Sequence, residues 1–177
     1  MAKKAKKSGN KILGFIFFAL VVVGLVLTIV GMCVDVVTKT DTLAGKVVST
    51  TYIKLFGDEW EGFSKLEITR TVVPMIAFIV TIVGLAVLAL DAVLRVFLGK
   101  DVKIVRIVGV ALSIVGAILI LVAGLVVVGA LNDKLGVDGS SIKSGIKYSA
   151  AAGIWLGFVG GLVGGVCGAL PLFKQFN

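Results

Sequence analysis

Four long apolar stretches constrain this chain more than any other feature. They cover residues 12–34, 71–94, 104–131 and 148–173, and each holds at most one charged residue, near an end. Each is long enough to cross the ~30 Å hydrocarbon layer as a helix, which takes about 20 residues. Because 58% of all residues are hydrophobic and only 16% are charged, a soluble globular domain and a disordered chain are excluded.

Only helices and closed barrels satisfy every backbone polar group in lipid. The four stretches are too long and too uniform for barrel strands, which have about 10 residues of alternating character. The sequence therefore predicts an all-α membrane protein, an antiparallel four-transmembrane-helix bundle that forms one domain over residues 1–177. The connecting segments 35–70 and 132–147 would lie together on one side, and the two termini on the other.

The distribution of charge predicts which side faces the cell interior. The side with the termini and the connection over residues 91–106 holds ten basic and two acidic residues, whereas the two loops on the other side hold eight of each, so the whole net charge of +8 lies on the first side. By the positive-inside rule, both termini are cytoplasmic and both loops extracellular, in what we expect to be the plasma membrane. The same charge predicts anionic lipid as a partner at the cytoplasmic face, at about 1 kcal/mol per basic group, and no nucleic acid.

The first extracellular loop, 35–70, has the composition of β-structure. Residues 46–56 are β-branched and aromatic, residues 64–70 alternate in polarity, and Gly57 and Gly62 between them are typical of a turn. We therefore expect a small β-hairpin or sheet there. Trp60 at the turn is either an anchor at the membrane interface or a contact for a partner. In the short loop 132–147, Ser140 or Ser141 is expected to cap an amphipathic lead-in to the fourth span.

Glycine rows in the fourth span predict close contact between helices, because small residues let helix backbones approach in lipid. Two rows with i+4 spacing lie side by side there, and smaller sets occur in the third and first spans. The predicted packing residues are Gly153, Gly157, Gly160, Gly161, Gly164, Gly165 and Gly168, with Gly109, Ser113, Gly116 and Gly24. The pattern leaves two interpretations open: packing inside one four-helix bundle, or an interface between subunits of a homo-oligomer.

The residues that carry most enzyme chemistry are missing. The chain has no histidine, and its two cysteines, Cys33 and Cys167, are expected near opposite faces of the membrane, which is too far apart for a disulfide or a shared metal. We therefore expect no enzyme activity, no cofactor and no metal. Asp91 and Arg95, at i and i+4, predict an ion pair at the membrane edge, with an ion or proton site as the alternative.

The layout resembles the claudin and peripheral-myelin-protein class of four-span proteins. The shared features are cytoplasmic ends, a long β-rich first outer loop, a short second one and small residues in the helices. Residues 60–62, Trp-Glu-Gly, resemble the tryptophan–glycine part of the claudin loop motif, whereas the first loop lacks that family's cysteine pair. The resemblance implies lateral assembly in the membrane through loop and helix-edge contacts.

These features favour a structural or interaction protein that self-associates laterally through its glycine-rich helix faces and presents a β-rich extracellular loop. One alternative is an oligomeric channel or small transporter subunit, with a path only between subunits. Another is an accessory subunit of a larger complex of membrane proteins.

Overall fold

The computed structural model describes residues 2–44, 46–56, 67–135 and 144–173. The chain is mostly helical, with four long helices: α1 (Ala2–Cys33), α2 (Glu67–Leu98), α3 (Lys103–Leu135) and α4 (Ala152–Phe173). All four are long and apolar enough to cross a membrane, as the sequence predicts. Trp60, Ser140 and Ser141 lie outside the described residues.

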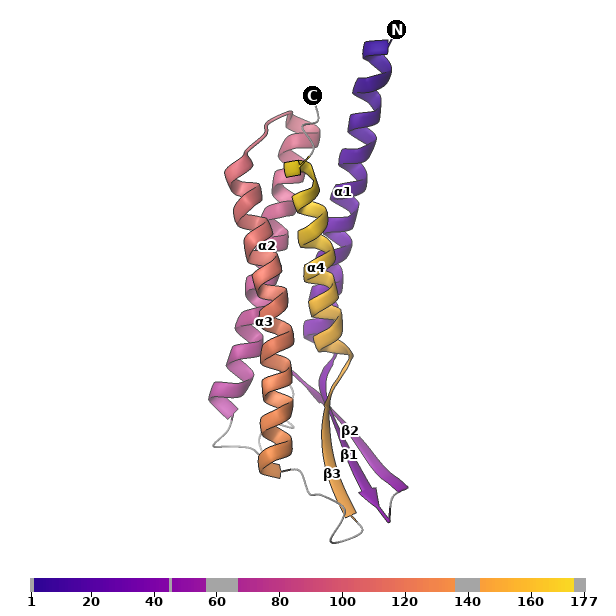
Figure 1. The fold of residues 1–177 in the computed structure, drawn as a ribbon, viewed down its shortest axis with the longest axis vertical. Coiled ribbons are helices and arrows are strands. Elements are labelled where there is room, and N and C mark those ends of the chain that lie inside the picture. Colours follow the sequence, from indigo (N-terminus) through magenta and orange to yellow (C-terminus); the bar gives the residue numbers. More distant parts are fainter. Residues whose placement is uncertain (1, 45, 57–66, 136–143, 174–177) are drawn as a thin grey trace.

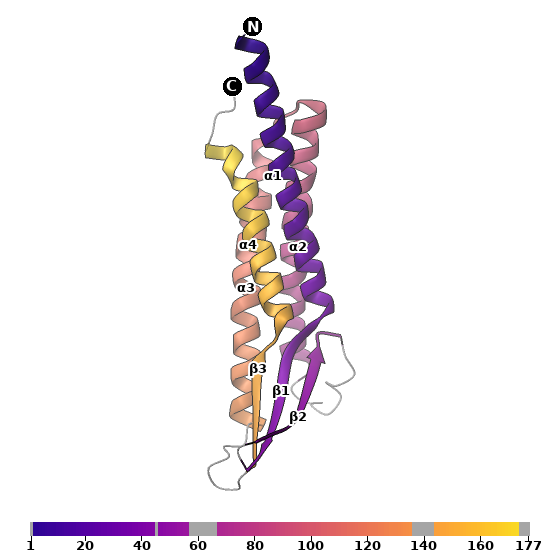
Figure 2. The same ribbon diagram turned by 90° about the vertical axis from the view of Figure 1, so that its right-hand side faces the viewer.

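The helices lie side by side, and a small sheet extends from one end of them (Figures 1 and 2). The start of α1, the α2–α3 connection and the last turn of α4 all lie at the opposite end (Figure 1). Within this arrangement α1 packs against α4, α2 against α3, and α3 against α4. Gly99, with a positive φ of 67°, follows α2 directly and reverses the chain into α3.

The sheet has three antiparallel strands in the order β2-β1-β3. β1 (Asp35–Leu43) follows α1 directly, β2 (Lys46–Lys54) returns toward the helices, and β3 (Ser144–Ala150) leads into α4. The turn between β1 and β2 includes Ala44 at a positive φ of 52°, an unusual conformation for a residue with a side chain. The sheet thus brings strands from two distant segments of the chain, 35–54 and 144–150, into one structure.

The predicted β-structure exists, but its strand pairing was predicted wrongly. Residues 46–54 form a strand as expected, yet the neighbour is β1, and Glu67–Arg70 of the predicted second strand belong to the first turn of α2. The expected lead-in to the fourth span is instead strand β3, so α4 begins at Ala152 and not at residue 148. Both errors have one physical cause: the partner of a strand is fixed by contacts between distant segments, which local alternation does not show.

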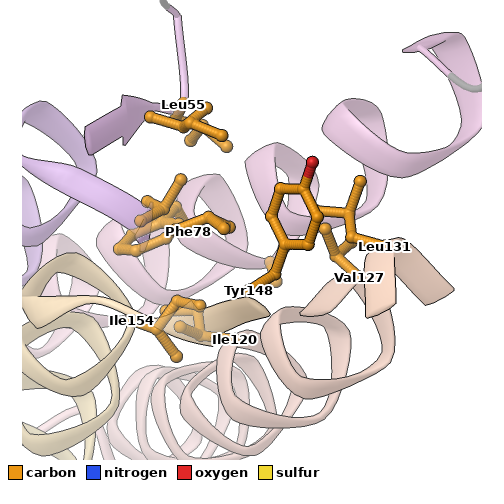
Figure 3. Packing of buried hydrophobic residues seen from close by; sticks show 11 residues of the cluster. Leu55, Phe78, Ile120, Val127, Leu131, Tyr148 and Ile154 are labelled. Carbon is orange, nitrogen blue, oxygen red and sulfur yellow. The ribbon is translucent and has the colours of Figure 1, made fainter. Parts of the chain in front are cut away.

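The main hydrophobic core lies where the sheet meets the helices. Val37 and Ile53 of the sheet pack with Phe78 of α2, Ile120 of α3 and Ile154 of α4. Figure 3 shows this cluster, with Leu55 and Tyr148 joining it from the sheet side and Val127 and Leu131 from α3. The sheet is therefore attached to the helices by buried apolar contacts, which fix its position relative to them.

Candidate functional site

The tightest helix contact joins α1 and α4, backbone against backbone. A Cβ placed on Gly24 would lie 2.6 Å from the carbonyl oxygen of Gly160, and one on Gly160 would lie 2.7 Å from that of Gly24. About two helical turns further along α1, a Cβ on Gly31 would lie 2.7 Å from the backbone nitrogen of Gly157 and 2.7 Å from the carbonyl oxygen of Gly153. No side chain larger than hydrogen fits at these crossings, so the glycines set the distance between the two helices.

The remaining glycines of α4 face α2 and α3 of the same chain. Gly161 lies against Ala117 and Thr81, Gly165 against Ser113, and Gly164 and Gly168 against Leu85 and Leu88 respectively. All seven predicted glycines of this helix thus contact neighbouring helices within one chain. This arrangement corresponds to the first of the two interpretations of the glycine rows, packing inside a single set of four helices.

The contact between α2 and α3 also depends on glycine. Gly109 of α3 faces Leu88, and Gly116 faces Thr81. Sequence reasoning missed Gly84 of α2, where a Cβ would lie 2.5 Å from the backbone nitrogen of Ser113. The available signal was its position as a lone glycine inside a long apolar helix, which often marks close backbone approach.

Three buried hydroxyl groups lie among these contacts, on Thr28, Thr81 and Ser113. Each donates a hydrogen bond to a carbonyl oxygen of its own helix, at 2.9 Å to Gly24, 2.8 Å to Ala77 and 3.0 Å to Val110. Because their hydrogens are engaged in the helix backbone, these side chains serve as small packing residues and do not present free donors to a solute.

A buried ionic cluster joins α2 and α3 at the end opposite the sheet. The Arg106 guanidinium donates from Nε to Asp91 Oδ2 at 2.8 Å and from Nη2 to Asp91 Oδ1 at 3.4 Å. It also pairs with Asp101, which is half exposed. Asp91 and Arg106 are each only 2% exposed. A bidentate pair with this geometry fixes the α2–α3 connection, and removing either partner would leave a buried charge uncompensated.

The predicted partner of Asp91 was wrong. Asp91 pairs with Arg106, 15 residues away on the facing helix, and not with Arg95, 4 residues away on its own helix. Spacing along one helix brings Asp91 and Arg95 to the same face, but the carboxylate is aimed at α3. Sequence reasoning had assigned Arg106 only to the cytoplasmic basic residues. Its place within an otherwise apolar stretch was the signal for a buried partner.

Arg95 instead lines a small cavity between α1, α2 and α4. Asp91 and Cys167 are among the other lining residues, with apolar side chains such as Leu88 around them. The cavity measures about 10 Å³, which is room for about one water molecule. A second cavity of the same size, under the sheet, is lined by apolar residues that include Val37 and Phe78. Neither is large enough for a substrate or a cofactor.

The outer edge of β3 is closed by a side chain from α3. Asn132 Nδ2 donates to the carbonyl oxygen of Tyr148 at 2.9 Å, and the Tyr148 backbone N–H donates to Asn132 Oδ1 at 2.8 Å. The amide thereby takes the place that a neighbouring strand would take. Burial raises the pKa of the Tyr148 phenol. Sequence reasoning missed this contact, because Asn132 reads as an ordinary loop residue.

No family model and no curated protein matches this chain. Among the described residues, no group of three or more metal-ligating side chains comes together, and both cysteines are free. The contacts described above, within the described part of the chain, are those of helix–helix and helix–sheet packing.

Proposed function

We propose that this protein is an integral membrane interaction protein whose four helices cross the bilayer and hold a small sheet outside it as a contact surface. The observation that carries the proposal is the contrast between the two parts of the molecule. Among the helices, the glycines, the buried hydroxyl groups and the Asp91–Arg106 pair all find their contacts within one chain. Outside, strand β2 leaves nearly all of its side chains exposed.

Lipid as the surroundings of the helices is supported by their outward faces. Large apolar side chains are exposed along all four helices, for example Val26, Val83, Val126 and Val159. A soluble protein rarely exposes so much contiguous apolar surface, whereas hydrocarbon covers it without cost.

The orientation that we propose places the sheet in the extracellular space. The helix ends opposite the sheet carry the basic N-terminal segment, Lys100 and Lys103, whereas the loops at the sheet end have no net charge. This asymmetry supports cytoplasmic termini, a plasma-membrane location and attraction of the basic end to anionic lipid.

Self-association is part of the proposal, but its surface differs from the one that the sequence suggested. The glycine rows are occupied within the chain, so contacts with other copies are assigned to the sheet and to the outward helix faces. Such contacts are what the resemblance to the claudin class implies. The channel or transporter alternative places its path between subunits, so the two small cavities within one chain do not bear on it.

Crosslinking in native membranes tests the proposal. We expect an amine- or thiol-reactive crosslinker to give discrete homo-oligomers, or adducts with other membrane proteins, across a wide range of lipid-to-protein ratios. A chain that stays monomeric at every ratio would contradict self-association. Ion flux through proteoliposomes of the purified protein would favour the channel instead.

A further inference from the structure

Strand β2, at one edge of the sheet, carries exposed apolar side chains. Val47, Val48 and Tyr52 are 57–64% exposed, and their strand lies at the sheet end of the molecule (Figure 1). Among the described residues, β2 pairs only with β1, while the opposite edge of the sheet is closed at Tyr148 by Asn132. Within the part of the chain that the structure describes, no second strand therefore pairs with β2 at this edge.

The hydrogen-bond pattern shows which backbone groups of β2 point outward. Tyr148 bonds to Asn132 and not to its cross-strand neighbour Lys39, so the backbone groups of Lys39 point the other way, toward Thr51. Alternation along an antiparallel strand then turns the N–H and C=O groups of Thr50 and Tyr52 toward the open edge. These groups are the template that an added strand requires.

The sequence of β2 reads chemically the same in both directions. Residues 46–54 are Lys-Val-Val-Ser-Thr-Thr-Tyr-Ile-Lys: two basic ends, two apolar pairs and a hydroxyl centre. Antiparallel pairing with a second β2 centred on Thr50 would set Thr50 opposite itself and Val48 opposite Tyr52. The lysines would meet only at the two ends, and a bulge that falls at Val48 limits the regular ladder to the central residues.

We propose that β2 pairs edge to edge with β2 of a second copy of this chain, forming a continuous six-stranded sheet around a two-fold axis at Thr50. This inference rests on the proposed placement of the sheet outside the membrane, and it adds a contact between facing membranes to the lateral contacts proposed above. The chemical symmetry of the strand favours a second copy over an unrelated peptide, because the apolar residues would meet apolar residues and the hydroxyl residues would meet hydroxyl residues.

The direction of the strands makes the contact one between facing membranes. The strands run away from the helices along the long axis of the molecule (Figures 1 and 2). A two-fold axis that makes two such strands antiparallel lies across this axis, so the helices of the second copy point the opposite way. Copies in the same bilayer point the same way and are unable to form this pair.

A charge exchange at residue 50 tests the pairing, because in this register the residue is its own partner. Two vesicle populations with different fluorescent lipids receive the purified full chain, and tethering is measured by two-colour coincidence. Thr50→Glu in both populations, or Thr50→Lys in both, should reduce tethering about fivefold through like-charge opposition. Glu in one population and Lys in the other should restore it. Side chain 50 is exposed, so these changes leave the fold intact.

Thiol crosslinking supplies a matched control. In a background with Cys33→Ser and Cys167→Ala, Thr50→Cys should form a disulfide dimer between differently tagged copies from two vesicle populations after mild oxidation. Ser149→Cys, also exposed but on β3, should not. Equal crosslinking at both positions, dimers confined to one vesicle population, or no rescue by the Glu–Lys combination would each overturn the pairing. If the pairing is overturned, labelling of Thr50→Cys on intact cells by an impermeant maleimide would still support the proposed function. If an impermeant maleimide does not label Thr50→Cys on intact cells, both the pairing and the proposed function are contradicted.

Discussion

Replacing Gly24 by alanine tests the idea that glycine sets the α1–α4 distance. The new Cβ would lie 2.6 Å from the Gly160 carbonyl oxygen and 2.9 Å from the Gly164 backbone. An ordinary carbon–oxygen contact is about 3.3 Å, so the helices must separate locally by ~0.7 Å. Overpacking of this kind costs about 1–3 kcal/mol. The better helix propensity of alanine returns at most ~1 kcal/mol, so we expect a net destabilisation of about 1–2 kcal/mol.

The chain offers a matched control for this substitution. Gly129 is also a helical glycine, in α3, but a Cβ placed on it would meet nothing within 4 Å. Gly129→Ala should therefore be neutral or slightly stabilising. The double variant Gly24→Ala with Gly160→Ala should cost less than the sum of the two single changes, because the first separates the helices for both.

Reversible unfolding in mixed micelles of a mild detergent and dodecyl sulfate, followed by circular dichroism, measures these free energies. If Gly24→Ala proves as harmless as Gly129→Ala, the α1–α4 crossing is not held by close backbone contact, and the explanation of the glycine rows fails.

Three further predictions concern polar contacts. Asp91→Asn should lower the free energy of unfolding by about 3 kcal/mol, because it leaves the buried charge of Arg106 with one partner fewer. Arg95→Gln should change the free energy of unfolding by less than ~1 kcal/mol. Similar losses for the two variants would indicate that Asp91 pairs with Arg95 after all. Asn132→Ala should speed hydrogen exchange at the Tyr148 amide several-fold and lower the free energy of unfolding by about 1–3 kcal/mol, since it leaves two backbone groups unpaired. Unchanged hydrogen exchange at this amide would contradict the bridge between α3 and β3. Because burial raises the pKa of the Tyr148 phenol, the unfolded chain ionises first, so stability should fall as the pH rises above about 10. The fall should be smaller in Tyr148→Phe, and equal pH profiles of the two proteins would show that the phenol is not buried.

The sequence was sufficient for the four long helices and for the small-residue face of the fourth one, although it missed the close contact at Gly84. Each apolar stretch exceeds the length of a membrane crossing, and the i+4 spacing of Gly153, Gly157, Gly161 and Gly165 can only mean a small-residue face. Whether that face meets the same chain or another one depends on how the helices are rotated. Local spacing carries no such information, and only the structure places these glycines against α1, α2 and α3.

The missed features all depend on contacts between distant segments. β1 pairs with β3, which lies about a hundred residues further along the chain, and Asp91 reaches across to Arg106 on the next helix. Asn132 gains its role only because α3 passes beside the edge of β3. None of these partners follows from periodicity within one element, since each requires the packing of the helices to be known first.

Cysteine labelling in intact cells tests most directly whether the four helices cross a membrane with the sheet outside. In a protein without its native cysteines, single cysteines replace Thr50 on β2 and Lys100 in the α2–α3 connection, both of which are exposed. An impermeant maleimide should label residue 50 in intact cells and residue 100 only after the membrane is opened. Labelling of residue 100 in intact cells, or of residue 50 only after opening, would contradict the proposed orientation.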